Sequence, residues 1–208
     1  MFDRRVIRLI YFIFICFLNS ACSEKKEYII PVDFAAFEKD FGTGLTQQDV
    51  NEIGQKHWEI IKENSLQKRL PETFVYSIEG NEIDLRSLIS KKTLIVFTDI
   101  HCGWGMEGIL TDLPAALGNL NDKEKKKNVI CLVVRTEADF EDQTRFNETI
   151  QEFILKYDQV YIIDEKESQK INVTASPTRM YFDEGQVLEY IGIGVTLPEN
   201  LLNELENN

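Results

Sequence analysis

The chain has 208 residues, with 35 acidic against 23 basic side chains and a net charge of −12. This acidity disfavours binding to nucleic acid, whose phosphates are contacted mainly by lysine and arginine. The length is enough for one domain that buries roughly 70% of the surface of its unfolded chain. Four cysteines and two histidines predict neither a disulfide framework nor a bound metal, and we expect no cofactor.

The N-terminal segment has the pattern of an export signal. Three arginines precede an apolar stretch at residues 9–18, which is about half of the roughly 20 residues needed to cross a bilayer. The residues up to Cys22 resemble a bacterial lipoprotein cleavage site, in which the cysteine is lipidated, although Asn19 occupies a position usually taken by Leu or Val. We predict a signal peptide at residues 1–21 and a lipid anchor on Cys22.

These predictions place the protein in the bacterial cell envelope, anchored to the membrane by lipid and facing the periplasm or the cell exterior. Two alternatives remain for the same segment. One is a short signal-anchor, and the other is an ordinary secretory signal with an incidental cysteine.

Residues 22–69 are predicted to form a polar tether followed by one helix. The helix should begin near Thr46, because Thr46 and Asp49 have the spacing of a capping box. His57 shares the apolar face of this helix, so we expect it to be packed there rather than to bind a metal. The positions of that face recur at helical spacing: Val50, Ile53, His57, Ile60 and Ile61.

Residues 70–208 are predicted to form one α/β domain. Alternating or continuous apolar runs predict strands, and apolar residues three or four apart predict helices. In chain order these are a strand at 74–78, a turn at 79–81, a short helical segment after 83–85, a strand at 93–98, a helix after Cys102, a strand at 129–134, a helix at 140–157, a strand at 160–163, a hairpin of 180–182 with 187–191, and a helix at 198–205. Parallel strand-helix-strand units followed by a hairpin indicate a mixed sheet with helices on its faces.

Cys102 is the residue that most directly suggests a function. It follows the apolar strand 93–98 and opens a helix, where the backbone N–H groups and the dipole of the first turn favour a thiolate. A two-cysteine redox motif would have its second cysteine at the position of Gly105. Any chemistry at Cys102 must therefore proceed without a local partner thiol.

Residues 70–206 resemble the thioredoxin-like superfamily, in particular its exported, membrane-anchored thiol-disulfide oxidoreductases (redoxins). The resemblance is carried by the short motifs 70–74, 79–81 with 83–85, 101–102, and 173–178 before the hairpin at Gly185 and Gly192. It implies a thioredoxin-like mixed sheet with helices on both faces, to which residues 22–69 add an N-terminal helical extension. It also implies that Pro177 is cis and faces the cysteine, while the backbone of Ser176 pairs with the substrate.

Three features depart from the pattern of that family. His101 stands where tryptophan is common, and Gly105 replaces the second cysteine. Pro114 lies twelve residues after Cys102 instead of the usual eight, which amounts to an additional helical turn.

The function predicted from these residues is thiol-disulfide exchange through a single cysteine. Cys102 would attack a disulfide or an oxidant, and an external thiol would resolve the product. Cys131 lies early in its strand, near the opposite edge of the sheet, and is predicted to be a buried core residue. The residues predicted to contact a protein thiol or disulfide partner are His101, Gly103, Trp104, Gly105, Ser176 and Pro177.

Three other functions are considered. In the first, the domain has kept the groove between Cys102 and Pro177 only to bind an envelope protein, with Trp104 as a contact residue and no electron transfer. A dinucleotide-binding enzyme is suggested by the G-x-G-x-x-G spacing of residues 103–108, although four residues separate the strand from the first glycine. A one-cysteine peroxidase is disfavoured because Asp99 occupies the position where threonine is expected.

Overall fold

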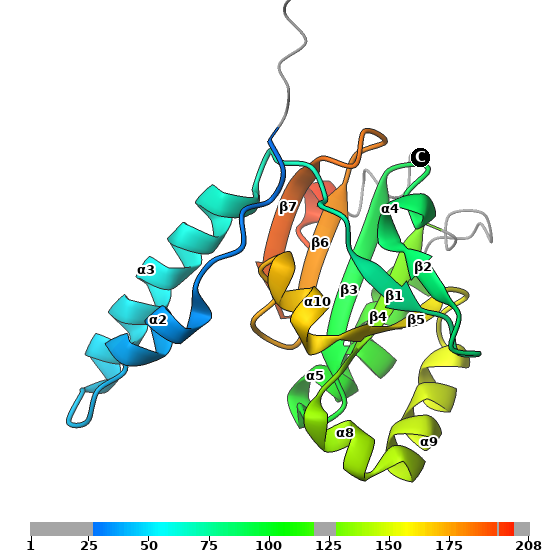
Figure 1. The fold of residues 1–208 in the computed structure, drawn as a ribbon, viewed down its shortest axis with the longest axis horizontal. Helices are drawn as coiled ribbons and strands as arrows, with labels where there is room; N and C mark the ends of the chain where they lie inside the picture. Colours follow the sequence, from blue (N-terminus) through cyan, green and yellow to red (C-terminus); the bar gives the residue numbers. More distant parts are fainter. Residues whose placement is uncertain (1–26, 119–127, 195, 202–208) are drawn as a thin grey trace, which may run out of the picture.

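The computed structural model describes residues 27–118, 128–194 and 196–201. One seven-stranded sheet runs through this part of the chain in the order β2-β1-β5-β4-β3-β6-β7 (Figure 1). The strands are β1 (Phe74–Tyr76), β2 (Glu82–Asp84), β3 (Thr93–Asp99), β4 (Val129–Arg135), β5 (Val160–Asp164), β6 (Thr178–Phe182) and β7 (Leu188–Ile193). The central strands β3, β4 and β5 are parallel and the outer pairs are antiparallel, which confirms the predicted mixed sheet.

Helices cover both faces of this sheet, as predicted. The described helices are α2 (Phe34–Asp40), α3 (Gln47–Ser65), α4 (Leu85–Leu88), α5 (Gly103–Glu107), the π-helix η1 (Gly108–Asp112), α6 (Leu113–Gly118), α8 (Glu137–Glu141), α9 (Gln143–Ile154) and α10 (Glu165–Lys170). Residues of η1, α6 and α9 pack on one face, and residues of α3 and α4 pack on the other.

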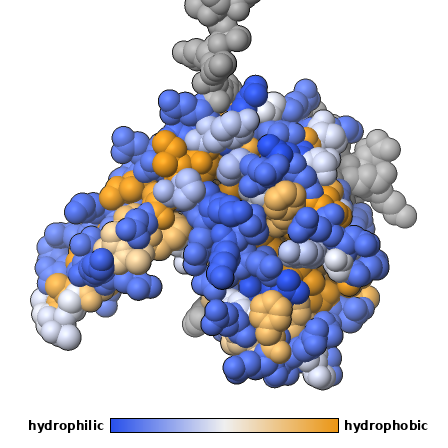
Figure 2. Space-filling view, viewed as in Figure 1, coloured by the Kyte–Doolittle hydropathy of each residue, from blue (hydrophilic) through white to orange (hydrophobic). Residues whose placement is uncertain are grey.

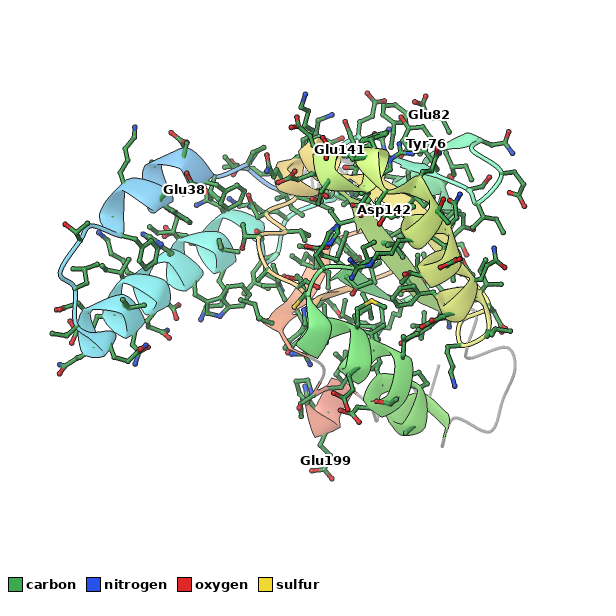
Figure 3. All side chains as sticks on the ribbon, turned by 90° about the horizontal axis from the view of Figure 1, so that it is seen from below. Glu38, Tyr76, Glu82, Glu141, Asp142 and Glu199 are labelled. Carbon is green, nitrogen blue, oxygen red and sulfur yellow. The ribbon has the colours of Figure 1, made fainter. Side chains whose placement is uncertain are left out.

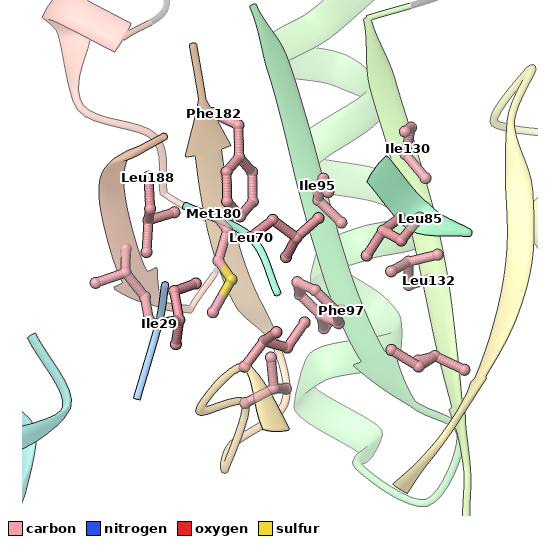
Figure 4. Close-up of a cluster of buried hydrophobic side chains, with 14 of the residues drawn as sticks. Ile29, Leu70, Leu85, Ile95, Phe97, Ile130, Leu132, Met180, Phe182 and Leu188 are labelled. Atoms are coloured by element: carbon pink, nitrogen blue, oxygen red, sulfur yellow. The ribbon is translucent and has the colours of Figure 1, made fainter. Parts of the chain in front are cut away.

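The central strands are apolar along their whole length because both of their faces are buried. All of residues 93–98 and 129–134 are buried, as expected for parallel strands covered by helices on both sides. Successive side chains alternate between two clusters, so Val96 packs on the α9 side and Phe97 on the opposite side. Figure 4 shows the second cluster, where Phe97 lies with Ile95 and Met180.

The helix after Cys102 changes its hydrogen-bonding pattern midway. Its π-helical part η1 separates α5 from α6, and the N–H of Leu113 donates to the carbonyl of Gly108, five residues earlier. Pro114 follows directly and has no N–H to continue an α-helical ladder. The long spacing between Cys102 and Pro114 is therefore accommodated in part by a π-helical segment.

The N-terminal extension consists of two helices, of which only α3 was predicted. Thr46 caps α3, with its N–H and hydroxyl donating to Asp49 at 2.8 and 2.7 Å, which confirms the predicted capping box. The shorter α2 begins after Asp33, whose carboxylate accepts the N–H of Ala36 at 3.2 Å. Together α2 and α3 form an arm beside the sheet (Figure 1).

Asn172 connects this arm to the domain through hydrogen bonds. Its Oδ1 accepts the N–H of Val32 at 2.9 Å, and its Nδ2 donates to the carbonyl of Ile30 at 3.0 Å and to Ser65 Oγ at 2.8 Å. Asn172 is buried and has a φ of 63°, a conformation that asparagine tolerates better than most residues. One side chain thus joins the segment before α2, the end of α3 and the loop after α10.

Several boundaries differ from the predictions. The single helix predicted at 140–157 is wrong, because α8 and α9 are separated at Asp142. The carboxylate of Asp142 accepts the N–H of Arg145 at 3.1 Å and so starts a new helix. The short elements β2 and α10 were not predicted either.

Some predictions fall on residues that the structure does not describe. The signal peptide at 1–21, the lipidated Cys22 and the polar tether lie outside the described residues, as do residues 202–205 of the last predicted helix. Residues 199–201 are helical, which agrees with the start of that helix. Within the described ranges, every helix is too short or too polar to cross a membrane.

The first prediction concerns the attachment of the arm. Asn172→Ala removes three hydrogen bonds and leaves the N–H of Val32, the carbonyl of Ile30 and the buried hydroxyl of Ser65 without that partner. We expect the free energy of unfolding to fall by about 2–4 kcal/mol, measured by urea denaturation. Ser65→Ala removes only one of the three bonds and serves as the control. Equal effects of the two substitutions would contradict the proposed role of Asn172.

Candidate functional site

Cys102 lies where β3 turns into α5. Its N–H donates to the carbonyl of Asp99 at 3.2 Å, and its own carbonyl accepts the N–H of Met106 at 2.9 Å. The second bond is the first of the helix, so Cys102 occupies the helix N-terminus that the sequence predicted. The residue is half-buried, and its thiol is free.

The Cys102 thiol contacts the loop that precedes β6. Cys102 Sγ lies 3.3 Å from the carbonyl oxygen of Ser176, to which the protonated thiol donates. The peptide bond between Ser176 and Pro177 is cis, as the family resemblance implied. Ser176 Oγ also accepts the N–H of Asp99 at 2.9 Å. Ser176 therefore contacts both the end of β3 and the thiol that follows it.

His101 pairs with an acidic residue of α8. Its Nε2 lies 2.9 Å from Oδ1 of Asp139, whose side chain is fully buried. Oδ2 of Asp139 accepts the N–H and the hydroxyl of Thr136 at 2.7 and 2.8 Å. The imidazole is thus held toward α8, and Asp139 is a residue of the site that the sequence analysis missed. The Thr136–Asp139 spacing, which is that of a capping box, was the available signal.

Cys131 is confirmed as a buried core residue. It pairs with Val96 across the sheet, well before the end of β3, and has no exposed surface. Burial raises the pKa of the Cys131 thiol well above its ordinary value. A thiol that is buried and protonated is a poor candidate for resolving a disulfide on Cys102.

Gly103, Trp104 and Gly105 all lie within α5. The G-x-G-x-x-G spacing therefore begins inside a helix, without a separate glycine loop to hold a phosphate. Gly103 is exposed, and a Cβ added there would meet no atom within 4 Å. The side chain of Trp104 and the surroundings of Gly105 lie outside what the structure describes, so their predicted partner contacts stay predictions.

Arg179 is a buried cation on β6, two residues after Pro177. Its Nη2 donates to the carbonyl of Ile193 at 2.8 Å, and its guanidinium carbon lies 5.7 Å from the centre of the Tyr190 ring. Burial lowers the pKa of the guanidinium. Its Nε and Nη1 have no partner among the described residues. No pattern in the sequence distinguished Arg179 from an ordinary surface arginine.

A groove of about 440 Å³ lies between the N-terminal arm and the domain. Figure 2 shows a concave surface between the arm and the domain. We call it the arm groove and define it by its principal lining residues, which come from α2, α3, the end of β3, α10, the loop before β6 and the end of β7: Phe34, Phe37, Glu38, Phe41, Gly54, His57, Trp58, Ile61, Asp99, Glu165, Ala175, Ser176 and Ile193. The groove includes Ser176 and therefore begins beside the thiol.

These features define the class of the protein. Parallel strands β3, β4 and β5, the hairpin of β6 and β7, a cysteine that opens the helix after β3, and a cis proline before β6 make a thioredoxin-like fold. At the position where a two-cysteine redox motif has its second cysteine, this chain has Gly105. The described residues contain no cluster of histidine, cysteine or carboxylate side chains able to hold a metal.

Comparison with known proteins gives similarities at the level of structure. A thiol:disulfide interchange protein from Bacteroides sp. is 17% identical, with a TM-score of 0.49, over 69% of this chain and 89% of that one. The thioredoxin domain of a thiol-disulfide oxidoreductase from Bacteroides vulgatus is 15% identical, with a TM-score of 0.49, over 69% and 96%. An exposed lipoprotein thioredoxin from Streptococcus pneumoniae is 18% identical, with a TM-score of 0.46, over 66% and 100%. No protein-family model and no curated protein matches the sequence.

The second prediction concerns Asp139. Asp139→Ala leaves His101 and two polar groups of Thr136 without their partner, whereas His101→Ala leaves the two bonds between Asp139 and Thr136 in place. We expect Asp139→Ala to lower the free energy of unfolding by about 2–4 kcal/mol and His101→Ala to cost clearly less, both measured by urea denaturation. A larger loss of unfolding free energy for His101→Ala would show that the Asp139 carboxylate is not the group that holds His101 and Thr136 in place.

Proposed function

We propose that this protein performs thiol-disulfide exchange through Cys102 alone, in the bacterial cell envelope, while anchored by lipid on Cys22. The observation that carries the proposal is the position of the Cys102 thiol, half-exposed at a helix N-terminus and 3.3 Å from the carbonyl of Ser176. A thiol in this position is accessible to a partner sulfur.

The proposed reaction exchanges one disulfide for another. The Cys102 thiolate attacks one sulfur of a partner disulfide, the partner S–S bond breaks, and the second partner sulfur leaves as a thiolate that takes up a proton. An external thiolate then attacks the partner sulfur of the mixed disulfide and forms a new disulfide with it, and Cys102 leaves as a thiolate that takes up a proton. Because Cys131 is buried, the second thiol must come from another molecule.

The alternative function is a binding module in which Cys102 no longer exchanges disulfides. The arm groove favours this alternative, since a hollow lined by aromatic residues beside Ser176 is suited to holding a partner segment whether or not a sulfur reacts. Exchange activity at Cys102 distinguishes the two functions.

The third prediction tests exchange. We define the single-thiol protein as the full chain with Cys16→Ser, Cys22→Ser and Cys131→Ala, purified in detergent. Cys102 is then its only thiol, and any thiol reaction takes place there. We expect a disulfide such as bis(2-hydroxyethyl) disulfide to form a mixed disulfide with this protein, because a half-exposed thiol can attack a disulfide sulfur. Cys102→Ser in the same background is the control. The absence of a mixed disulfide on Cys102 would favour the binding module.

The fourth prediction tests the anchor. A lipidated cysteine holds a protein to the membrane through its acyl chains, so Cys22→Ala should move the protein from the membrane fraction to the soluble fraction of the cell envelope. Cys16→Ala should leave it in the membrane fraction, since Cys16 lies within the predicted signal peptide. The mass of the N-terminal peptide provides a direct check. An unmodified Cys22 in the mature protein would contradict the proposal.

A further inference from the structure

The arm groove is formed in part by two helical faces that the arm turns toward the domain. On α2 the lining residues Phe34, Phe37 and Glu38 have helical spacing, and Phe41 follows at the end of the helix. On α3 the lining residues are Gly54, His57, Trp58 and Ile61, again three or four apart. Residues at this spacing share one face of a helix, so both helices present an apolar and largely aromatic face to the groove.

Contacts within the arm fix this aromatic wall. The His57 ring stacks on Phe37, with ring centroids 3.9 Å apart and an interplanar angle of 5°. Nε2 of His57 lies 2.7 Å from a carboxylate oxygen of Asp40. Through Asn172 the arm is in turn bonded to the domain. The wall is therefore held in place before any ligand binds.

The opposite wall of the groove reaches the redox site. Ala175 and Ser176 line it, and the carbonyl of Ser176 is the group that Cys102 Sγ contacts. The N–H groups of Ala175 and Ser176 donate to no described residue. An extended chain that pairs with this loop, and whose sulfur faces Cys102, would have its neighbouring residues in the arm groove.

The charges of the groove are of one sign. Glu38 of α2, Asp99 of β3 and Glu165 of α10 line it, whereas no lysine or arginine does. Glu38 is exposed on the arm (Figure 3). The groove thus combines aromatic surface with carboxylates, a combination that favours apolar side chains next to a cationic one.

We propose that the N-terminal arm recognises the substrate: the arm groove binds an extended segment of the partner protein that carries apolar side chains and a lysine or arginine beside its reacting cysteine. This inference rests on the proposed function, because the bound segment delivers the sulfur that reacts with Cys102. The groove volume of about 440 Å³ lies within the range of sites that bury a few side chains of a ligand.

Peptide disulfides test the preference. Three short peptides carry one cysteine as a mixed disulfide with nitrothiobenzoate: one with Phe, Leu and Lys beside the cysteine, one with Glu in place of Lys, and one with Gly and Ser only. We expect the single-thiol protein to react with the first about tenfold faster than with the third. The advantage of Lys over Glu should shrink at high salt and in Glu38→Lys, which leaves Asp99 and Glu165 against one added cation.

Gly54 is a position from which a side chain can be introduced into the groove. A Cβ at Gly54 would meet no atom within 4 Å, and a larger residue in place of glycine favours a helix. Gly54→Trp should slow the reaction of the Phe-Leu-Lys peptide about tenfold relative to the single-thiol protein with Gly54. Gln55→Trp is the matched control, because Gln55 is exposed on the same helix but does not line the groove.

The outcomes separate this inference from the proposed function. Equal rates for the three peptides would overturn the inference, and so would a Gly54→Trp variant that reacts normally with the Phe-Leu-Lys peptide. In either case, exchange with bis(2-hydroxyethyl) disulfide would still support the proposed function. If the small disulfide does not react, binding of the Phe-Leu-Lys peptide with Ser in place of Cys is measured by calorimetry. Binding that Gly54→Trp weakens then supports the groove and rejects exchange, and the absence of binding rejects both.

Discussion

The site depends on the contact between Ser176 and the end of β3. Ser176 uses its hydroxyl to accept the N–H of Asp99 and its carbonyl to receive the thiol of Cys102. These bonds join the last residue of one central strand to the loop before the neighbouring one, so the helix N-terminus, the cis proline and the thiol share one small region. Without this junction, the cysteine would be a surface thiol at the end of a strand, with no surface to orient a partner.

The central sheet was largely predictable from the sequence, and the reason is physical. Strands buried on both faces, such as 93–98 and 129–134, have to be apolar at every position, and such runs are easily recognised. The division of the helix 140–157 was missed because a single capping residue, Asp142, interrupts a pattern that is apolar on both sides. The short helix α2 was missed because it precedes the Gly42–Gly44 breaker and has few residues over which a period can be seen.

The candidate site was predictable only where it is local in sequence. Cys102 at a helix N-terminus follows from the order of strand and helix. The pairing of His101 with Asp139 joins residues 38 apart, and the arm groove joins α2 to residues that follow by more than 130 positions. Neither a hydrophobic period nor a short motif in a single sequence indicates which residues far apart in the chain meet in the fold. Only the packing of the arm against the domain shows that residues of the N-terminal extension line the groove beside Ser176.

Glycine at position 54 implies a compromise between stability and binding. Within an exposed helix, glycine costs about 0.5–1 kcal/mol relative to alanine, and nothing nearby forbids a side chain there. A chain under selection for thermal stability alone would gain from filling this position. If the hollow serves recognition, stabilising substitutions along this face of α3 should come at the expense of partner affinity, so thermostability screens and binding screens would select opposite residues at position 54.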